Sequence, residues 1–375
     1  MGKWMGAWVK KHYPEAYRDL CTSFIDRGFT LSAADGYSAM VTMQSWMFLG
    51  SFEKLRGKIL RNHSISSMAH LGTRAFGAIA GEVVSTTATV FANAKSEVRG
   101  AYFRLVDMGS EAEKQAGLLE ALADPKCGWF YRTSSENFTG IPGVPIVYWA
   151  SRKTLEAFSR GCSFWNFASP RVGMQTGNND RFLRLWWEVS MIKMATACAN
   201  QDDFNSSHAR WVPYNKGGHF RKWYGNLDYV LNWQNEGESI KALAPGEKRS
   251  FSILPEQYRF KPAITWTDIT SSCTHFRFRP MGSLYDIKGM SCFPPEEHRL
   301  YVLGFCNSIV ATMMLKMLSP TMNTQVGDVG KLPILKASQE AAVNIDAFVA
   351  NSINCAKRDW DSFETSWEFK KHPLS

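Results

Sequence analysis

Residues 35–71 read DGYSAMVTMQSWMFLGSFEKLRGKILRNHSISSMAHL, and the pattern of this stretch changes twice. The Asp35-Gly36 pair is typical of a turn, and the apolar run Tyr37–Met43 that follows is typical of a strand. Ser51 is expected to cap a helix with one apolar face, after which residues 65–71 again have the pattern of a strand. This order of strand, helix and strand predicts a βαβ unit with parallel strands.

The neighbouring segments extend this unit on both sides. Apolar residues recur at helical spacing over residues 17–28, before the first strand. Residues 83–93 and 101–106 are rich in strand-forming residues with no helix between them, so they are expected to pair antiparallel at the sheet edge. Residues 111–123 have the composition of a polar helix. From residue 124 to residue 145, prolines, glycines and polar residues interrupt all periodicity, which indicates a linker.

The second half of the chain has shorter patterns. Residues 151–160 indicate a capped helix, and short strands with many turns follow up to about residue 295, which predicts an irregular β-rich module. Residues 300–318 predict one long buried helix, and residues 337–367 a helical tail. The predicted fold class is therefore an α/β part followed by an α+β domain and a helical tail. The boundaries are expected at 1–123, a linker 124–145, 146–335 and 336–375.

The composition is that of a folded globular protein with acidic partners. Of the 375 residues, 45% are apolar and 21% are charged, and the net charge is +9. The eight cysteines include no C-x-x-C pair and no spacing suited to a zinc site or a disulfide framework, which favours reduced thiols in a cytoplasm. The longest run without charge is shorter than a bilayer span, so no membrane partner is expected.

One block of the second half combines positive charge with aromatic rings. Residues 204–227 contain no acidic residue, and Gly217-Gly218 lies within them. Lysine and arginine neutralise phosphates, aromatic rings stack on bases, and glycines let the backbone approach a ligand, so nucleic acid is the first interpretation. A solvated basic surface over an aromatic core remains the alternative, and the fourteen tryptophans keep sugar binding open. The residues of the block are Arg210, Lys216, Arg221 and Lys222 among Trp211, Tyr214, Phe220, Trp223 and Tyr224.

Two further blocks place side-chain amides beside glycines. They are residues 171–182, with Gln175-Thr-Gly-Asn-Asn-Asp180, and residues 321–332, with Gln325-Val-Gly-Asp328. Asparagine and glutamine amides make paired hydrogen bonds to adenine edges, and arginine makes them to guanine. The alternative, of equal weight for any single block, is that these amides close turns and satisfy their own backbone.

Four ordered blocks together resemble one family, the adenine-specific DNA methyltransferases of BREX phage-defence systems (PglX-like), which are related to the type IIG restriction-methylation enzymes. The resemblance covers essentially the whole chain, and four blocks in order are far more specific than one. The blocks are Val41–Leu49 with Phe52–Arg56, Thr176–Phe182, Tyr214–Gly218 with Arg221–Gly225, and Asp359–Trp367.

The resemblance implies several functional parts, of which this chain contains only some. In that family, a class I methyltransferase domain binds S-adenosylmethionine through an aromatic-x-Gly-x-Gly motif, an Asn-Pro-Pro-Tyr loop grips the flipped adenine, and a target-recognition domain follows. Neither motif is present here, and the opening Met1-Gly2 matches the family's continuation after that tyrosine. We therefore expect residues 1–123 to supply the closing, C-terminal half of a Rossmann-like methyltransferase sheet. We expect no catalytic residue, no cofactor bound by this chain alone, and no activity alone.

The same resemblance gives the candidate contact residues. Lys216, Arg221 and Lys222 are expected to act mainly on phosphates, and the loop 175–179 is expected to read bases. Phe91 matches a position at which related enzymes stack a ring on the extruded base, with a plain core position as its alternative. The candidate DNA-binding residues are Arg171, Gln175, Thr176, Gly177, Asn178, Asn179, Arg181, Lys216, Gly217, Gly218, Arg221, Lys222, Trp223 and Tyr224.

The expected function is that of the target-recognition portion of a site-specific N6-adenine DNA methyltransferase in phage defence or restriction-modification, with double-stranded DNA as partner. Two alternatives stay open: a subunit of a split methyltransferase that is completed by an upstream half, and a non-catalytic DNA-binding or interaction protein that contacts other defence proteins. Metal and hydrolase chemistry is disfavoured, because the histidines lack metal-binding spacing and no nucleophile elbow or Walker loop is present.

Overall fold

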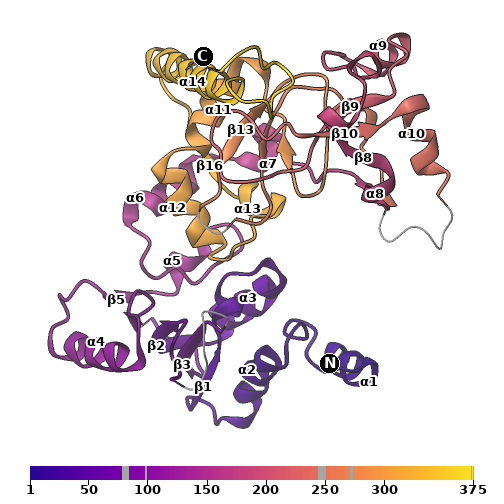
Figure 1. Ribbon diagram of the computed structural model, residues 1–375. Coiled ribbons are helices and arrows are strands. Elements are labelled where there is room, and N and C mark those ends of the chain that lie inside the picture. Colours follow the sequence, from indigo (N-terminus) through magenta and orange to yellow (C-terminus); the bar gives the residue numbers. More distant parts are fainter. Residues whose placement is uncertain (78–83, 98, 244–250, 271–272, 373, 375) are drawn as a thin grey trace. The chain divides into compact units, whose positions relative to one another are not determined.

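The computed structural model describes residues 1–77, 84–97, 99–243, 251–270, 273–372 and 374, and the chain divides into two compact units (Figure 1). Unit 1 contains residues 1–160 and 317–320, and unit 2 contains residues 161–316 and 321–375. Both units mix helices with strands, so the mixed α/β class predicted from the sequence is confirmed.

Unit 1 is built around one mixed sheet with helices beside it. Its strands are β1 (Tyr37–Met43), β2 (Ser64–Gly72), β3 (Thr86–Ala92), β4 (Gly100–Arg104) and β5 (Phe130–Thr133). Its helices are α1 (Lys3–His12), α2 (Leu20–Leu31), α3 (Glu53–Asn62), α4 (Glu111–Ala123), α5 (Glu136–Thr139) and α6 (Arg152–Arg160), with short 3-10 turns η1 (Gln44–Met47) and η2 (Gly50–Phe52). The segment 124–145 is not irregular throughout, because it contains β5 and α5.

The strand order of this sheet is β1-β3-β2-β4-β5. β1 and β2 run in the same direction, as the βαβ pattern predicts, but each pairs antiparallel with β3, which lies between them. β4 pairs parallel with β2 and antiparallel with β5. The prediction that residues 83–93 and 101–106 pair with each other at the edge is therefore wrong, and Val83 lies outside the described residues.

A physical reason for the position of β3 is its composition. Its sequence TTATVFA is rich in β-branched residues and is mostly buried, which suits an interior strand better than an edge. The crossover through α3 carries the chain past one strand width, and β3 fills the space that is left between β1 and β2. Local composition indicated a strand at this place, but the pairing depends on residues distant in sequence.

The beginning of α3 is held by a buried arginine. The prediction that Ser51 caps this helix is wrong, because Ser51 lies within η2. The residue before the helix is Phe52, which makes no side-chain cap bond. Arg56 is 0% exposed, and burial lowers the pKa of its guanidinium to about 10. The guanidinium donates hydrogen bonds of 2.6 to 3.2 Å to the carbonyl oxygens of Trp46, Leu49, Gly143 and Val144.

Unit 2 consists of short strands joined by turns and covered by helices. Its strands are β6 (Cys162–Ser163), β7 (Gln175–Thr176), β8 (Leu183–Leu185), β9 (Trp211–Asn215), β10 (Tyr229–Asn232), β11 (Phe251–Ser252), β12 (Ala263–Trp266), β13 (Phe276–Arg279), β14 (Leu284–Tyr285), β15 (Ser291–Cys292) and β16 (Pro333–Ile334). Its helices are α7 (Phe164–Ala168), α8 (Asn179–Phe182), α9 (Gln201–Ser206), α10 (Gln234–Lys241), α11 (Arg299–Cys306), α12 (Ile309–Leu318, whose last two residues are assigned to unit 1), α13 (Val326–Val329) and α14 (Gln339–Trp360). Short 3-10 turns complete it: η3 (Trp186–Glu188), η4 (Met191–Lys193), η5 (Glu256–Tyr258) and η6 (Glu296–His298).

The strands of unit 2 form several small sheets, as the irregular β-rich pattern predicts. One has the order β14-β9-β10-β8 and another the order β13-β12-β15, while β11 pairs with β7 and β16 with β6. β9 is buried along its whole length, and its residues Val212 and Tyr214 enter a core that also contains Trp233, Phe260 and Tyr285. This core fixes the end of β9, from which the candidate site begins.

The prediction of one continuous helix over residues 300–318 is wrong. This segment is broken at Asn307 and Ser308 into α11 and α12, and the two halves are bent by 74°. The Asn307 side chain accepts from the Phe276 backbone N–H (3.1 Å) and donates to its carbonyl oxygen (2.9 Å), so it ties the break to β13. The Ser308 hydroxyl then accepts from the Ala311 backbone N–H and caps α12.

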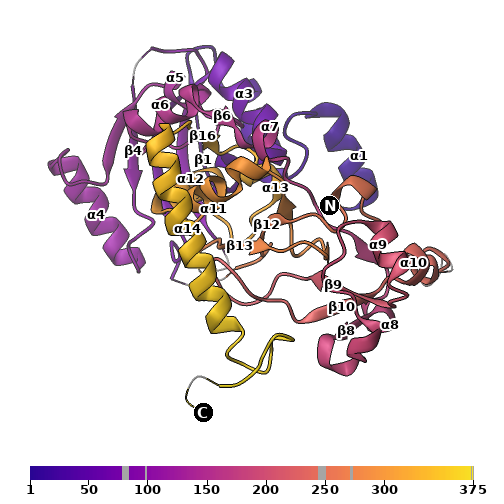
Figure 2. The same ribbon diagram turned by 90° about the horizontal axis from the view of Figure 1, so that it is seen from above.

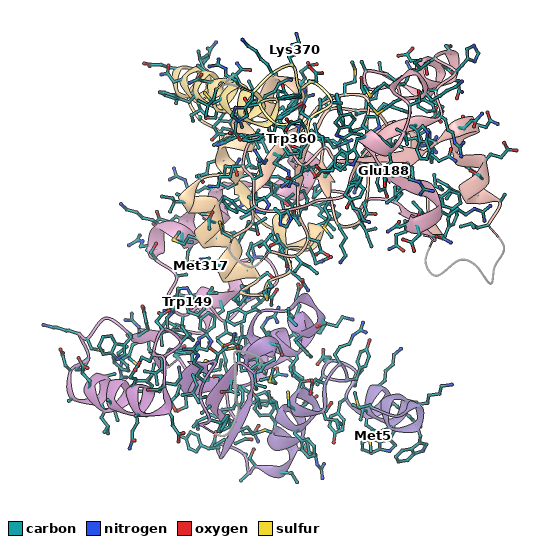
Figure 3. All side chains as sticks on the ribbon, viewed as in Figure 1. Met5, Trp149, Glu188, Met317, Trp360 and Lys370 are labelled. Carbon is teal, nitrogen blue, oxygen red and sulfur yellow. The ribbon has the colours of Figure 1, made fainter. Side chains whose placement is uncertain are left out.

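The helix of the predicted tail 337–367 forms over Gln339–Trp360 and packs against the aromatic block, whereas residues 361–367 form turns instead of helix. α14 is the long yellow helix in Figure 2, and it packs beside α11. Trp360, at its end, is labelled in Figure 3 and lies in a small core with Tyr224 and Leu227. The Ser338 hydroxyl caps the start of α14 by accepting from the Ala341 backbone N–H at 3.3 Å.

Candidate nucleic-acid interface

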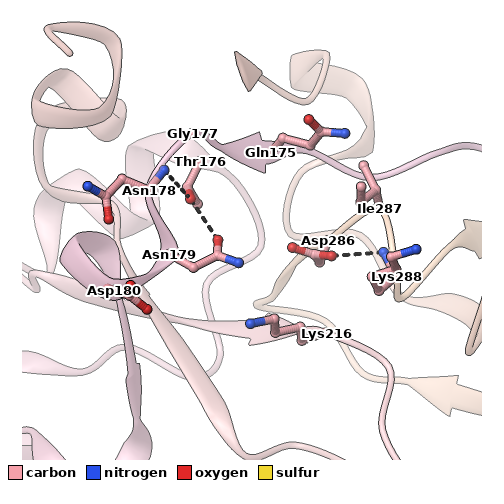
Figure 4. Close-up of a pocket in the computed structure, with 10 residues that line it drawn as sticks. All are labelled: Gln175, Thr176, Gly177, Asn178, Asn179, Asp180, Lys216, Asp286, Ile287 and Lys288. Atoms are coloured by element: carbon pink, nitrogen blue, oxygen red, sulfur yellow. Dashed lines mark hydrogen bonds between the residues drawn. The ribbon is translucent and has the colours of Figure 1, made fainter. Parts of the chain in front are cut away.

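Unit 2 contains a cavity of about 470 Å³ into which several polar side chains project (Figure 4). Three segments that are far apart in the sequence form it: the loop between β7 and α8, the residue after β9, and the turn after β14. β14 pairs parallel with β9, so both strands end at the same edge and deliver Lys216 and Asp286 to one place. The cavity is lined by Gln175, Thr176, Gly177, Asn178, Asn179, Asp180, Lys216, Asp286, Ile287 and Lys288.

The loop 175–180 has its shape fixed by its own side chains. Gly177 has a φ of +77°, a conformation that glycine adopts without strain. The Thr176 hydroxyl donates to Asn179 Oδ1 (2.7 Å) and accepts from the Asn178 backbone N–H (3.2 Å). Asn178 Oδ1 caps α8 by accepting from the Arg181 backbone N–H (3.1 Å). The amide oxygens thus close the turn, while within the described chain the Nδ2 groups of Asn178 and Asn179 have no protein acceptor.

Asp286 is a recessed carboxylate on the opposite wall. It is 4% exposed, and it accepts from the Tyr214 hydroxyl (3.1 Å) and from the Lys288 backbone N–H (2.8 Å). Burial raises the pKa of its carboxyl; these two hydrogen bonds and the charges of Lys216 and Lys288 offset only part of that rise. A buried carboxylate held in one orientation is a directed hydrogen-bond acceptor. Because burial of a charged carboxylate is unfavourable, such a group in a cavity is a candidate functional residue.

The two lysines of the cavity have different surroundings. Lys216 Nζ lies 5.1 Å from the centre of the Tyr229 ring, at cation–π distance, and the side chain is half-buried. Lys288 Nζ lies 2.6 Å from Asp268 Oδ2, and Gln325 donates to the other oxygen of Asp268. The third amide block, which contains Gln325, is therefore linked to the cavity through Asp268.

The glycine pair of the basic block serves the packing of the protein itself. Gly217 has a φ of +91° and is buried, and a Cβ there would lie 2.7 Å from the carbonyl oxygen of Lys288. Gly218 has a φ of +122°, and a Cβ there would lie 2.8 Å from the Asn226 amide nitrogen. Glycine at these two positions makes room for the Lys288 backbone and for the Asn226 side chain, whereas the sequence pattern predicted close approach by a ligand.

Two further cations of the block, Arg221 and Lys222, have partners elsewhere in unit 2. Arg221 Nη1 lies 2.8 Å from Asp359 Oδ2, and its guanidinium stacks over the Trp360 ring at 5.0 Å. Lys222 Nζ donates to the carbonyl oxygen of Asn307 at 3.2 Å, at the end of α11. In the described part of the chain neither side chain lines the cavity, so the structure separates Arg221 and Lys222 from Lys216.

The other predicted contact residues also lie outside the cavity lining, as far as the described residues show. Trp223 exchanges backbone hydrogen bonds with β13, and Tyr224 is 7% exposed; burial raises the pKa of its hydroxyl to about 12. Arg171 Nε donates to the Tyr258 hydroxyl at 2.9 Å. Arg181 is exposed on α8, at 5.3 Å from the centre of the Phe182 ring.

Comparisons with known proteins extend over the whole chain. The family model of the Eco57I restriction-modification methylase matches residues 1–76. The adenine-specific methyltransferase PglX of Lacticaseibacillus casei (strain Zhang) is 41% identical over 382 residues, which cover 100% of this chain and 31% of the relative. The adenine-specific methyltransferase BrxX of Escherichia coli O9:H4 (strain HS) is 36% identical and covers 98% of this chain and 29% of the relative.

The chain is homologous to a part of the PglX-like methyltransferases. The resemblance predicted from four sequence blocks is thus confirmed, and the chain spans about a third of the length of the curated relatives it matches. A solved structure of the type IIL restriction-modification enzyme MmeI in complex with DNA is similar in fold, with a TM-score of 0.52 at 10% identity over 93% of this chain and 45% of that chain.

Three of the four PglX-like blocks lie in unit 2 and contact each other there, while the block Val41–Leu49 with Phe52–Arg56 lies in unit 1. The block Arg221–Gly225 contacts the block Asp359–Trp367 through the Arg221–Asp359 ion pair and through Tyr224 against Trp360. The block Thr176–Phe182 and the block that contains Lys216 meet in the cavity. Two of the contacts between blocks are therefore structural, and one forms a site.

Phe91 occupies an interior position in unit 1. It is 1% exposed in β3, and its ring lies 5.6 Å from the Phe29 ring and 5.7 Å from the Trp46 ring. This placement agrees with the alternative of a core aromatic, because stacking on a base requires one face of the ring to be free. A stacking role would need Phe91 to leave this core.

Asp286, Ile287 and Lys288 were missed as site residues. The local signal was weak: Asp286 to Gly289 is a turn sequence with an acid, a lysine and a glycine, and such turns are common on protein surfaces. What makes these residues part of a site is the pairing of β14 with β9, which joins positions about seventy residues apart. No local pattern encodes that pairing.

The described residues offer neither a metal cluster nor a single membrane-spanning helix. They contain no group of three or more histidine, cysteine, aspartate or glutamate side chains that could hold a metal ion. Within the described chain no single helix is long and apolar enough to cross a membrane. The bent pair Glu296–Cys306 and Ile309–Leu318 reaches that length and apolar composition only when its two helices are taken together.

Proposed function

We propose that the chain is the DNA-recognising part of a site-specific adenine methyltransferase. The observation that carries this proposal is the cavity in unit 2, which collects the amide loop 175–180 and Lys216 in a chain homologous throughout to adenine-specific methyltransferases. Amides, a lysine and a fixed carboxylate around one cavity are the groups that read base edges. In this proposal unit 2 acts as a target-recognition domain, with α14 as the helical tail that closes it.

Unit 1 is proposed to supply the closing strands of a Rossmann-like methyltransferase sheet. The match of the methylase family model to residues 1–76 supports this assignment. Among the described strands β1 pairs with β3 alone, and its outward residues Tyr37 and Val41 are 67% and 58% exposed. An apolar groove of about 470 Å³ extends from β1 across β3, β2 and β4 to α4. An open edge next to an uncovered apolar face is expected where further strands and helices pack.

S-adenosylmethionine is the cofactor that the methyltransferase relatives imply. Its sulfonium, amino-acid group and ribose hydroxyls need charged and polar partners. The groove of unit 1 offers mainly alkyl and aromatic side chains, such as Met68, Val90 and Phe103, so it does not fit this cofactor. Together with the missing glycine and Asn-Pro-Pro-Tyr motifs, this supports a chain that does not bind S-adenosylmethionine alone.

The proposal is tested by measuring the binding of the 375-residue chain to duplex DNA. A neutral polysaccharide of about the same length as the duplex serves as the competitor. Saturable binding to duplex DNA that the polysaccharide does not compete is expected. Affinity for the polysaccharide without affinity for DNA would contradict the proposal and favour the sugar-binding alternative. Calorimetry with S-adenosylmethionine is expected to show no heat of binding, and binding would overturn the assignment of the cofactor site to another segment.

The exposed β1 edge favours a second form of this function, a subunit of a split methyltransferase. An upstream methyltransferase half would add its strands at β1 and cover the groove beside it. Mixing the two polypeptides with labelled S-adenosylmethionine and duplex DNA is then expected to transfer methyl groups, while neither polypeptide does so alone. DNA binding without transfer in any mixture would favour the non-catalytic DNA-binding or interaction protein.

A further inference from the structure

The cavity of unit 2 is balanced in charge. Its lining contains two lysines, Lys216 and Lys288, and two aspartates, Asp180 and Asp286. Lys288 already has Asp268 as an ion-pair partner at 2.6 Å. A phosphate in this cavity would therefore meet two carboxylates and one lysine whose charge is already shared, in contrast to the excess of positive charge that phosphate sites present.

The cavity instead combines a fixed acceptor with separate donors. Tyr214 and the backbone of Lys288 orient the Asp286 carboxylate, and each of its oxygens keeps a second lone pair for a ligand. Lys216 Nζ and Asn179 Nδ2 supply donors, and Figure 4 shows Asp286, Lys216 and Asn179 directed toward the same space. A ligand that matches these groups has one edge that carries a hydrogen-bond donor beside an acceptor and no negative charge.

We propose that this cavity reads a base edge that presents an amino donor beside an acceptor, with Asp286 accepting from the amino group and Lys216 or Asn179 donating to the neighbouring acceptor. Adenine offers its 6-amino group beside N7, and a C·G pair offers the cytosine 4-amino group beside guanine O6. The proposal rests on the proposed function in DNA recognition. It makes Asp286 and Lys216 specificity-determining residues and removes Lys216 from the phosphate contacts expected from sequence.

The test is selection of binding sites from a pool of random duplexes, followed by titration of the best site and its single-base variants. The wild-type 375-residue chain is compared with Asp286→Asn and Lys216→Gln. One position of the site is expected to favour an amino-bearing base by about tenfold or more in the wild type. In both variants that preference is expected to fall below about threefold, while the other positions keep theirs and the salt dependence of affinity stays unchanged.

Two variants outside the cavity serve as matched controls, Asp202→Asn on α9 and Lys193→Gln on η4, both exposed. They make the same changes of charge and are expected to leave every base preference as in the wild type. Asn179→Ala, at the exposed rim, is the additional variant if Asp286→Asn does not fold, and it is expected to weaken the same position.

The outcomes separate this inference from the function on which it rests. Unchanged base preferences in Asp286→Asn, Lys216→Gln and Asn179→Ala would overturn the inference and leave DNA recognition standing. A loss of affinity for all sequences in Lys216→Gln, with a salt slope reduced by about one, would identify a phosphate contact and also overturn it. Absence of duplex binding by the wild type would overturn the proposed function together with the inference.

Discussion

Replacement of Gly217 by alanine is expected to destabilise unit 2 substantially. Gly217 has a φ of +91°, and a non-glycine residue in such a conformation costs about 1–3 kcal/mol. The added Cβ would lie 2.7 Å from the carbonyl oxygen of Lys288 and 3.2 Å from Thr267 Cγ2, so the chain around the cavity must shift, at a further cost of about 1–3 kcal/mol. The free energy of unfolding is thus expected to fall by about 2–6 kcal/mol.

The assay is urea unfolding followed by tryptophan fluorescence, with Gly327→Ala as the matched control. Gly327 lies in α13, has an ordinary φ, and a Cβ there would meet no atom within 4 Å. Alanine at that place is expected to leave stability unchanged or to raise it by up to about 1 kcal/mol, because alanine favours a helix more than glycine does. If Gly217→Ala is as stable as Gly327→Ala, the close approach of the backbone at Gly217 is wrong.

Three further predictions concern other contacts of unit 2. A double-mutant cycle on Arg221 and Asp359, read by urea unfolding, is expected to give a coupling of only about 0.2–1 kcal/mol, since both side chains are partly exposed; more than about 2 kcal/mol would mean a dominant structural pair. Asn307→Ala is expected to cost about 1–3 kcal/mol in the same assay, because the Phe276 backbone N–H loses its acceptor while its carbonyl oxygen keeps the Trp223 N–H, and a loss below about 0.5 kcal/mol would refute this explanation of the helix break. Because burial raises the pKa of Asp286 above its ordinary value of 3.8, the wild type is expected to lose stability relative to Asp286→Asn as the pH rises from 3.8 through the raised pKa. Thermal unfolding of both proteins as a function of pH measures this, and a stability difference independent of pH would contradict it.

The sequence predicted most of the elements of unit 1 and fewer of their pairings. The strand Tyr37–Met43 and the helix Glu111–Ala123 have the predicted bounds, because alternation, helical spacing and capping are local signals. The insertion of β3 between β1 and β2 and the break at Asn307 were not predicted. Both depend on contacts with distant strands: the position of β3 follows from its pairing with β1 and β2, and the break at Asn307 follows from its hydrogen bonds to Phe276 in β13, 31 residues earlier.

The candidate site shows the same division between local and distant information. Residues 175–180 and Lys216 were selected from composition, and the structure brings them to one cavity. Arg221 and Lys222 were selected by the same composition, but their partners Asp359 and Asn307 are distant in sequence and hold them elsewhere. Asp286 was missed because its role follows from the pairing of β14 with β9.

The most direct test of a DNA-recognising chain is the affinity of the 375-residue protein for duplex DNA as a function of salt, measured by fluorescence anisotropy. We predict saturable binding at about 50 mM salt, and a linear fall of the logarithm of the association constant with the logarithm of salt concentration up to about 200 mM. Binding that does not depend on salt, or no binding of duplex DNA at about 50 mM, would contradict the account.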